Sequence, residues 1–186
     1  MLRRLAPCAA LAATASALLA GCSPTAPTET TPATSASETH GVDERQLSVE
    51  TREAWDAYQA VLTEFGAEPA LATRERLLDV ATAEVTDVLL ANFQDAANRR
   101  IHTEGTRQTM NFQLADIADA PGFITAHVCV DVSGERVMGD EGIDLTPADR
   151  EALQASAVEF SLAPDRERYL VDGQSSIEEE VAEACG

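Results

Sequence analysis

The sequence predicts an α+β domain, because apolar residues repeat with different periods in its two halves. From Ser48 to Arg100 they recur every three or four positions, which is typical of helices that bury one face. From Met110 onwards apolar and polar residues alternate, which is typical of half-buried strands. Helices followed by an antiparallel sheet indicate the α+β class.

Two helical segments are expected in the first half. The first ends at Gly66, and its apolar face comprises Trp55, Tyr58, Val61, Leu62 and Phe65. The second begins at a Thr73 cap, runs to about Arg100 and stops before Gly105. Its apolar positions are Leu77, Leu78, Ala81, Val85, Val88, Leu89 and Phe93. Each segment should bury one face against the rest of the domain.

Four strands are expected in the second half, at residues 110–115, 125–132, 158–162 and 168–172. An acidic loop separates the second strand from the third. It leads into Thr146-Pro147-Ala148-Asp149, a capping box with proline at the first helical position. This pattern predicts a short helix through about Leu153.

The N-terminus resembles the leader of a bacterial lipoprotein. Two arginines precede an almost wholly apolar segment from Leu5 to Ala20, and the tetrad Leu19 to Cys22 resembles a lipobox. In such precursors the cysteine thiol receives a diacylglycerol and the preceding segment is cleaved. The resemblance therefore implies lipidation of Cys22 and an extracytoplasmic, membrane-anchored protein. An uncleaved membrane helix is the alternative, but this apolar segment is short for a span of roughly 20 residues.

The domain organisation follows from this leader and from composition. Residues 1–21 are expected to be the signal peptide. Residues 22–40 are rich in Thr, Pro and Ser and have no periodic apolar positions, so we expect a disordered tether. Residues 41–186 are long enough for one ordinary folded domain.

The charge of the chain argues against nucleic acid as a partner. The formal net charge is -19, from 32 acidic and 13 basic residues, and all of the basic residues are arginines. Binding to phosphates requires clustered Lys and Arg side chains. We interpret the acidity mainly as a source of solubility and of repulsion from an anionic surface.

Several short segments together resemble a known family. They are an Ala54-x-x-Ala57-Tyr58 helix, a second helix containing Ala81-Thr82, the strand end Cys129-Val130-Asp131-Val132-Ser133, a following segment from Val137 to Gly142, the hairpin strand Tyr169-Leu170-Val171 and a Glu-rich tail ending in Cys185. Over most of Ser48 to Cys185 the chain is similar to small secreted lipoproteins of Gram-positive bacteria with an NTF2-like fold. The resemblance implies a cone, in which a curved sheet wraps around helices and leaves room for a pocket at its open end.

The cysteines predict one disulfide. Cys8 leaves with the leader and Cys22 carries the lipid, so Cys129 and Cys185 remain as a pair in an oxidising compartment. A metal site would need further ligands at suitable spacing, and the sequence offers none. No cofactor is expected.

Two groups of polar residues allow alternative interpretations. His127 and Asp131 share a strand face with Cys129, and Glu159 is expected on the same face of a neighbouring strand. They could form a metal or acid–base cluster, but we favour a solvent-facing surface because alternation places them away from the core. The loop from Gly139 to Asp144 could ligate calcium, although it lacks the EF-hand spacing.

A possible pocket in the cone would be lined by Trp55, Tyr58, Phe112 and Asp116. Core packing is the favoured alternative for the two helical aromatic residues. Alternation with Phe112 and Leu114 predicts that Asp116 points inward.

Two classes of function follow. We favour a non-enzymatic module of the cell envelope that binds a small ligand or another envelope protein. The alternative is a small enzyme like the ketosteroid isomerases, with buried Asp116 as base and Tyr58 as hydrogen-bond donor. The sequence contains no Gly-rich phosphate loop, nucleophile elbow or His-x-x-x-His helix.

Overall fold

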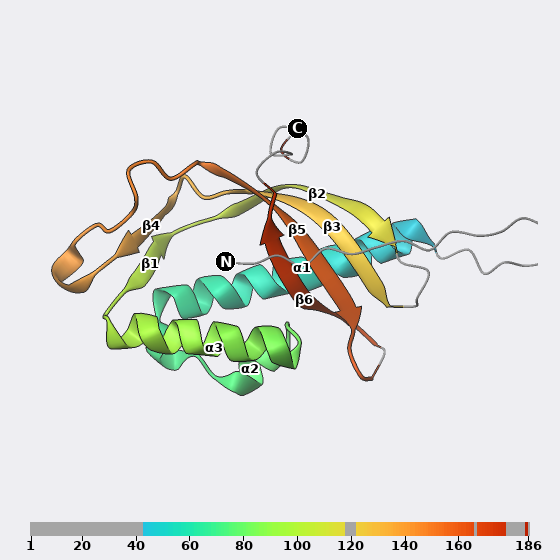
Figure 1. Cartoon of the computed structure of the whole chain (residues 1–186), viewed down its shortest axis with the longest axis horizontal. Coiled ribbons are helices and arrows are strands. Elements are labelled where there is room, and N and C mark those ends of the chain that lie inside the picture. The colour runs from blue at the N-terminus through green and yellow to red at the C-terminus, as the bar shows by residue number, and fades with distance from the viewer. Residues whose placement is uncertain (1–42, 118–121, 166, 178–184, 186) are drawn as a thin grey trace, which may run out of the picture. The chain divides into compact units, whose positions relative to one another are not determined.

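The computed structural model describes residues 43–117, 122–165, 167–177 and 185. Helices pack against a curved antiparallel sheet that does not close into a barrel, which confirms the α+β class (Figure 1). None of the helices in this described part has the length and apolar character that a bilayer span requires. The signal peptide, Cys22, the tether and most of the Glu-rich tail lie outside the described residues.

The first predicted helix is present as α1, Glu44–Ala67. Asp43 caps it, because its carboxylate accepts hydrogen bonds from the backbone N–H groups of Arg45 and Gln46. The buried residues follow the predicted period and are Leu47, Thr51, Trp55, Tyr58, Val61 and Phe65. A short 3-10 turn, η1 at Pro69–Leu71, follows the end of the helix.

The second predicted helix is divided into α2, Arg74–Leu78, and α3, Ala83–Asn98. Thr73 caps α2 as expected, with its hydroxyl accepting from the N–H of Arg76. The division arises because the chain between the helices pairs with a strand: the N–H of Thr82 donates to the carbonyl of Val171. Tertiary pairing with a distant strand thus overrides the continuous helical period.

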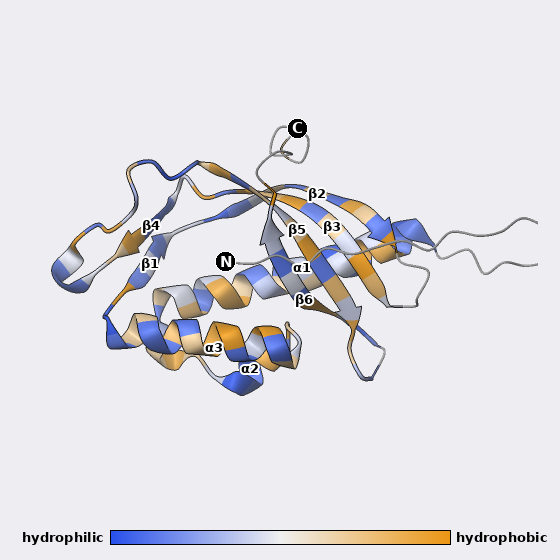
Figure 2. Ribbon diagram, viewed as in Figure 1, coloured by the Kyte–Doolittle hydropathy of each residue, from blue (hydrophilic) through white to orange (hydrophobic). Residues whose placement is uncertain are grey.

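The main sheet has the strand order β2-β3-β5-β6 and is antiparallel throughout. Its strands are β2 at Gln108–Ile117, β3 at Phe123–Asp131, β5 at Leu153–Leu162 and β6 at Tyr169–Ser176. They correspond to the four predicted strands, although each of them is longer than predicted. Figure 2 shows hydrophobic and hydrophilic residues alternating along them, as a sheet with one buried face requires.

Two further strands, which the sequence did not predict, form a separate antiparallel pair. They are β1 at His102–Gly105 and β4 at Glu135–Met138. β1 leads almost directly into β2, and β3 leads almost directly into β4, so the two pairs are successive parts of one bent hairpin (Figure 1).

The predicted helix from Thr146 to Leu153 is wrong. This segment is a turn that leads into β5, and its polar groups bond to other parts of the chain. The hydroxyl of Thr146 accepts from the N–H of Val137, and the guanidinium of Arg150 donates to the carbonyls of Val132 and Glu135. These distant partners satisfy the groups that a capping box would have used locally.

The core lies between the helices and the concave face of the main sheet. Its largest fully buried side chains include Trp55, Phe160 and Leu77. On the other face of the sheet, Cys129 is fully buried and forms the predicted disulfide with Cys185, with Cα atoms 5.0 Å apart. The Cys129–Cys185 pairing is therefore confirmed.

Candidate ligand-binding cleft

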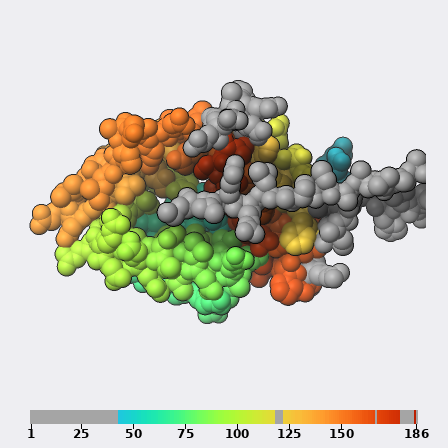
Figure 3. Space-filling view, in the orientation of Figure 1, coloured from blue at the N-terminus to red at the C-terminus, as the bar shows by residue number. Residues whose placement is uncertain are grey.

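A cleft of about 360 Å³ opens where the C-terminal half of α1 faces the β1–β4 pair. We call it the polar cleft, and its lining residues are Thr63, Ala67, Glu68, His102, Thr103, Glu104, Gly105, Arg107 and Glu135. The space-filling view also shows a hollow between the helices and the sheet on one face of the molecule (Figure 3). The volume of the polar cleft is near the lower end of the range for small-molecule sites, roughly 300–1,000 Å³.

The bend in the hairpin brings the cleft residues together. Gly105 adopts φ +92°, a left-handed conformation that favours glycine, and a Cβ atom there would collide with the carbonyl oxygen of Gly134. The N–H of Thr106 donates to the same carbonyl. This close approach of the two backbones turns the hairpin between its two sheets and places Arg107 beside Glu135.

Arg107 and Glu135 form an ion pair at the base of the cleft. An Nη atom of Arg107 lies 2.5 Å from Oε1 of Glu135, and the glutamate is only 8% exposed. The Arg107 side chain is 28% exposed, but its Nε atom is buried and has no hydrogen-bond partner among the residues that the structure describes. The exposed part of the guanidinium therefore belongs to its Nη atoms, one of which is engaged by Glu135.

Arg150 holds the other side of the bend. Its guanidinium donates to the backbone carbonyls of Val132 and Glu135, the two residues that flank the turn between β3 and β4. The N–H of Val132 in turn donates to the carbonyl of Ala152, just before β5. The backbone that carries Glu135 is therefore held from both sides.

Beneath the cleft, α1 contributes aromatic residues to the core rather than to the cleft lining. Burial raises the pKa of Tyr58 to about 12, with the nearby positive charge of Arg107 acting in the opposite direction. Trp55 is fully buried and donates from Nε1 to the hydroxyl of Thr109, at 2.9 Å. These positions agree with core packing, the alternative that we favoured for both residues.

A second ionisable pair lies at the rim of the cleft. His102 Nε2 and Glu104 Oε1 are 3.3 Å apart, on neighbouring positions of the same face of β1. Both side chains are more exposed than the Arg107–Glu135 pair. The rim therefore presents a carboxylate and an imidazole to solvent.

An adjoining cleft of about 520 Å³ shares Ala67, Glu68 and His102 with the polar cleft. We call it the loop cleft, because its other wall is the loop at residues 139–142. Arg100 and Asp140 close it with an ion pair of 2.7 Å, and the hydrogen bond and charge of Arg100 lower the pKa of Asp140. Arg100 has a positive φ of 55°, so α3 ends there in a left-handed residue.

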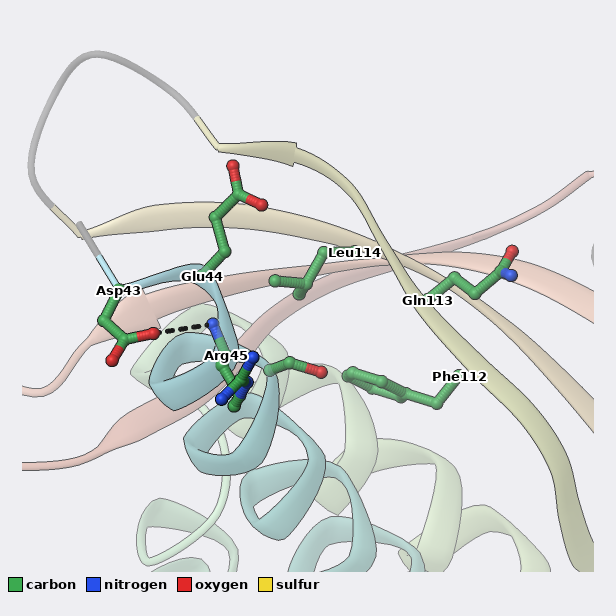
Figure 4. Close-up of a pocket in the computed structure, with 7 residues that line it drawn as sticks. Asp43, Glu44, Arg45, Phe112, Gln113 and Leu114 are labelled. Carbon is green, nitrogen blue, oxygen red and sulfur yellow. Dashed lines mark hydrogen bonds between the residues drawn. The ribbon is translucent and has the colours of Figure 1, made fainter. Parts of the chain in front are cut away.

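A third, wide and open groove lies at the first turn of α1 and has a volume of about 1060 Å³. Figure 4 shows Phe112 and Leu114 of β2 facing this helix end, whereas Gln113 points away. The remaining lining residues are Asp43, Glu44, Arg45 and Ser48. Phe112 thus lines a pocket, but this helix-tip groove is distinct from the one expected beside Trp55 and Tyr58.

The inward position predicted for Asp116 is wrong, because this side chain is exposed. The pairing of β2 with β3 shifts between Leu114 and Asp116, which inserts one extra residue. A β-bulge of this kind reverses the alternation of side chains beyond it. The structure therefore does not supply the buried carboxylate that the enzyme alternative required at this position.

The polar face of β3 is more enclosed than predicted. His127 and Asp131 are half-buried rather than fully solvent-facing, whereas Glu159 is exposed and lies opposite Thr125. The side-chain and backbone hydrogen bonds of Ser133 lower the pKa of Asp131. This carboxylate therefore stabilises the turn after β3.

Two of the three carboxylates in the loop from Gly139 to Asp144 have protein partners. Asp140 pairs with Arg100, and Asp144 accepts from the N–H of Thr146. Across the described ranges, no three His, Cys, Asp or Glu residues are grouped closely enough to hold a metal ion.

Sequence reasoning did not find Arg107, Glu135 or His102 as members of one site. The available signal was a glycine near each of the two predicted strands, Gly105 and Gly134, because glycine marks places where two backbones approach closely. Arg107 and Glu135 are 28 positions apart. Neither residue belongs to a recognisable motif.

Comparisons with known proteins show a likeness of fold only. No family model and no curated protein matches the chain. The crystal structure of the intermembrane space region of chloroplast protein ARC6 matches with a TM-score of 0.51 and 6% identity, over 70% of this chain and 95% of that chain. The solution structure of a de novo designed β-sheet protein matches with a TM-score of 0.34 and 12% identity, over 67% and 85%. The NTF2-like assignment stays a prediction.

Proposed function

We propose that this protein is a lipid-anchored, extracytoplasmic module that binds a small ligand in the polar cleft and catalyses no reaction. The anchor rests on the leader and on Cys22. The binding function rests on one observation above all, the Arg107–Glu135 ion pair in the lining of a cleft of small-molecule size. Small-molecule sites place a few fixed polar groups in a concave surface, and this ion pair supplies two of them.

The positions of the aromatic residues and of Asp116 support a binding module over the enzyme alternative. Tyr58 is 3% exposed and packs in the core, where a substrate would have to displace neighbouring side chains to reach it. Asp116 is exposed on β2, whereas the enzyme alternative requires a buried carboxylate as its base. The base and the donor of that mechanism therefore lack their required surroundings.

The proposal can be tested with arginine resonances, because each candidate pocket contains a different arginine. Arg107 lines the polar cleft, Arg100 the loop cleft and Arg45 the helix-tip groove. The full chain, labelled with nitrogen-15 at arginine and held in detergent micelles, would be screened by NMR against a library of small polar molecules. We expect the molecules that bind to shift the Nε–H resonance of Arg107.

An Arg107→Lys variant assigns that resonance by its disappearance. Arg136, which is exposed on β4 outside the polar cleft, provides the control resonance that should stay unchanged. Library molecules that shift Arg45 or Arg100 and never Arg107 would place the binding site elsewhere. The proposal would also be overturned if no molecule in the library bound and a protein partner instead covered the polar cleft.

A further inference from the structure

We infer that the loop cleft is a second binding site, and that its ligand is an amphipathic amine: a small molecule with an apolar body and one ammonium group. The inference does not rest on the proposed function, because the loop cleft has walls of its own and shares only part of its lining with the polar cleft. Three features lead to it: fixed walls, an exposed apolar surface within the cleft, and carboxylates without an arginine partner.

Hydrogen bonds fix both walls of the loop cleft. On one side α3 ends with the N–H of Arg100 donating to the carbonyl of Ala97, at 3.1 Å. On the other side the N–H of Gly139 donates to the carbonyl of Ile143, at 2.7 Å, which closes the loop on itself. The ion pair between Arg100 and Asp140 joins the two sides. The cleft of about 520 Å³ is therefore formed without a ligand, as is usual for small-molecule sites.

Each wall also contains a residue in a strained conformation. Within the described ranges, the non-glycine residues with positive φ are Arg100 at 55° and Glu141 at 59°, and both line the loop cleft. Residues of this kind persist only where the surrounding structure fixes them, and they are concentrated at functional sites. The backbone is thus strained at two positions whose side chains border the cleft.

One wall of the loop cleft is apolar although it is open to solvent. The apolar lining residues come from the ends of α1 and α3 and from η1, and they are Ala67, Pro69, Ala70, Leu71, Ala97 and Ile101. Leu71 is 59% exposed. An apolar group seated against this wall would remove its surface from water, which is favourable in proportion to the area covered. The ligand therefore needs an apolar body.

The charges of the lining favour a cationic group on that body. The charge of Arg100 is compensated by Asp140, at 2.7 Å. Glu68 and Glu141 also line the cleft, and neither has an ion-pair partner in the described part of the chain. The lining thus has an excess of negative charge, which attracts an ammonium group and repels a carboxylate or phosphate.

The inference is tested with four probes that separate the body from the charge. Three share one aromatic body: 2-phenylethylamine as its ammonium form, 2-phenylethanol and 3-phenylpropionate. The fourth, ethylammonium, has the charge without the ring. Each is titrated into the full chain, labelled with nitrogen-15 at arginine, in micelles of a neutral detergent, and micelles without protein provide the blank. The Arg100 Nε–H resonance, assigned by its loss in Arg100→Lys, reports binding.

We expect 2-phenylethylammonium to bind most tightly. The alcohol and the carboxylate should each bind several-fold more weakly, because they lack the positive charge. Ethylammonium should bind about ten-fold more weakly or less tightly still, because it lacks the apolar body. The advantage of the amine over the alcohol should shrink at high salt, since the carboxylates are exposed.

Several outcomes would overturn the inference. Equal binding of the alcohol or the carboxylate would show that charge does not select the ligand, and equal binding of ethylammonium would show that the apolar wall does not. An amine that shifts Arg107 and not Arg100 would bind in the polar cleft instead. A lysine-rich peptide that shifts Arg100 when 2-phenylethylammonium does not would identify a protein partner. The first two outcomes leave the proposed function, which is read from Arg107, unaffected, and the third supports it.

A matched pair of variants tests the apolar wall. Leu71 and Val88 are both 59% exposed, but Val88 lies on α3 outside the lining of the loop cleft. Leu71→Ser should weaken the binding of 2-phenylethylammonium about five-fold, because the ligand loses its apolar contact. Val88→Ser should bind like the wild type. Undiminished binding by Leu71→Ser would overturn the inference.

A second pair of variants tests the charge. The double variant Glu68→Gln/Glu141→Gln keeps the shape of both side chains but removes their charges, so the amine should lose most of its advantage over the alcohol. Glu159→Gln removes an exposed carboxylate on β5 and should leave that advantage unchanged. A double variant that keeps the full preference for the amine would overturn the inference.

Discussion

The guanidinium of Arg107 and the carboxylate of Glu135 meet at 2.5 Å, at the point where one long hairpin bends from the main sheet into the β1–β4 pair. The two residues are 28 positions apart, so no local sequence pattern predicts their contact. The left-handed Gly105 and its approach to Gly134 turn the backbone, and Arg150 holds the carbonyl of Glu135 from the opposite side. The same bend therefore creates the ion pair and one wall of the polar cleft.

Replacing Gly105 by alanine should destabilise the domain by more than about 2 kcal/mol. The change adds the cost of a left-handed alanine, about 1–2 kcal/mol, to a collision with the Gly134 carbonyl. Fluorescence of Trp55, the only tryptophan, would report unfolding in urea. Gly142→Ala is the control, because Gly142 has φ +76° but open space around its Cβ position, so it should cost only about 1 kcal/mol. Equal losses in the two variants would show that the close approach is unimportant.

Replacing Glu135 by alanine should cost about 1–3 kcal/mol of unfolding free energy. The change leaves the charge of Arg107 without its partner, but the partial exposure of Arg107 lets water compensate for part of the loss. Asp56→Ala is a matched control, because it breaks the exposed Arg52–Asp56 pair and should cost no more than about 0.5 kcal/mol. If both variants unfold at the same denaturant concentration, the Arg107–Glu135 pair does not stabilise the bend.

Removing the disulfide should destabilise the fold without abolishing its helices. Cys129 and Cys185 are 56 positions apart, and the chain-entropy model assigns about 4 kcal/mol to closing a loop of that length. A double Cys129→Ala/Cys185→Ala variant should therefore unfold at lower denaturant concentration while its helical circular dichroism stays close to that of the wild type. Peptide mapping under non-reducing conditions that recovers both thiols free would contradict the pairing.

The stability of the domain should fall in alkaline solution as Tyr58 loses its proton. Burial raises the pKa of Tyr58 to about 12, so between about pH 10 and pH 12 the folded state keeps a proton that the unfolded state has lost. Its contribution of about 2–3 kcal/mol is complete below pH 10 and disappears as the pH rises through 12.

The protein has only two tyrosines, Tyr58 and Tyr169, which makes this prediction simple to measure by phenolate absorbance. Burial also raises the pKa of Tyr169, with Glu50 acting in the same direction. Tyr58→Phe should remove the later titration and reduce the alkaline loss of stability. A wild-type protein in which both tyrosines titrate near 10 would show that Tyr58 is accessible to water.

Replacing Cys22 by serine should release the protein from the membrane fraction or leave it as uncleaved precursor. The thiol is the group that receives the diacylglycerol in the lipoproteins that this leader resembles, and two acyl chains suffice for stable anchoring. Fractionation of cells followed by mass spectrometry of the N-terminal peptide would measure both outcomes. An unlipidated Cys22 in the membrane-bound wild type would refute the anchor.

Much of the fold follows from signals that are local in the sequence. The period of three to four predicts the buried face of α1, because every residue on that face contacts the same side of the domain. Alternation predicts the four strands of the main sheet for the same reason. The cysteine pair follows from counting thiols in an oxidising compartment, and the structure contains that disulfide.

The candidate site could not be predicted from those local signals. Asp116 illustrates the limit, because a single extra residue in β2 reverses the side chains that follow, and the bulge depends on pairing with β3. The pairing of Thr82 with Val171 divides the predicted second helix in the same way.

The sequence by itself determined the class of the domain, the helical face of α1 and the Cys129–Cys185 pair. Only the tertiary structure decided where the hairpin bends, and hence that Arg107 meets Glu135. The physical reason is that periodicity records which side of one segment is buried, whereas an ion pair and a cleft depend on the register between two segments. That register arises from backbone hydrogen bonds and close contacts such as Gly105 against Gly134, which neither segment encodes alone.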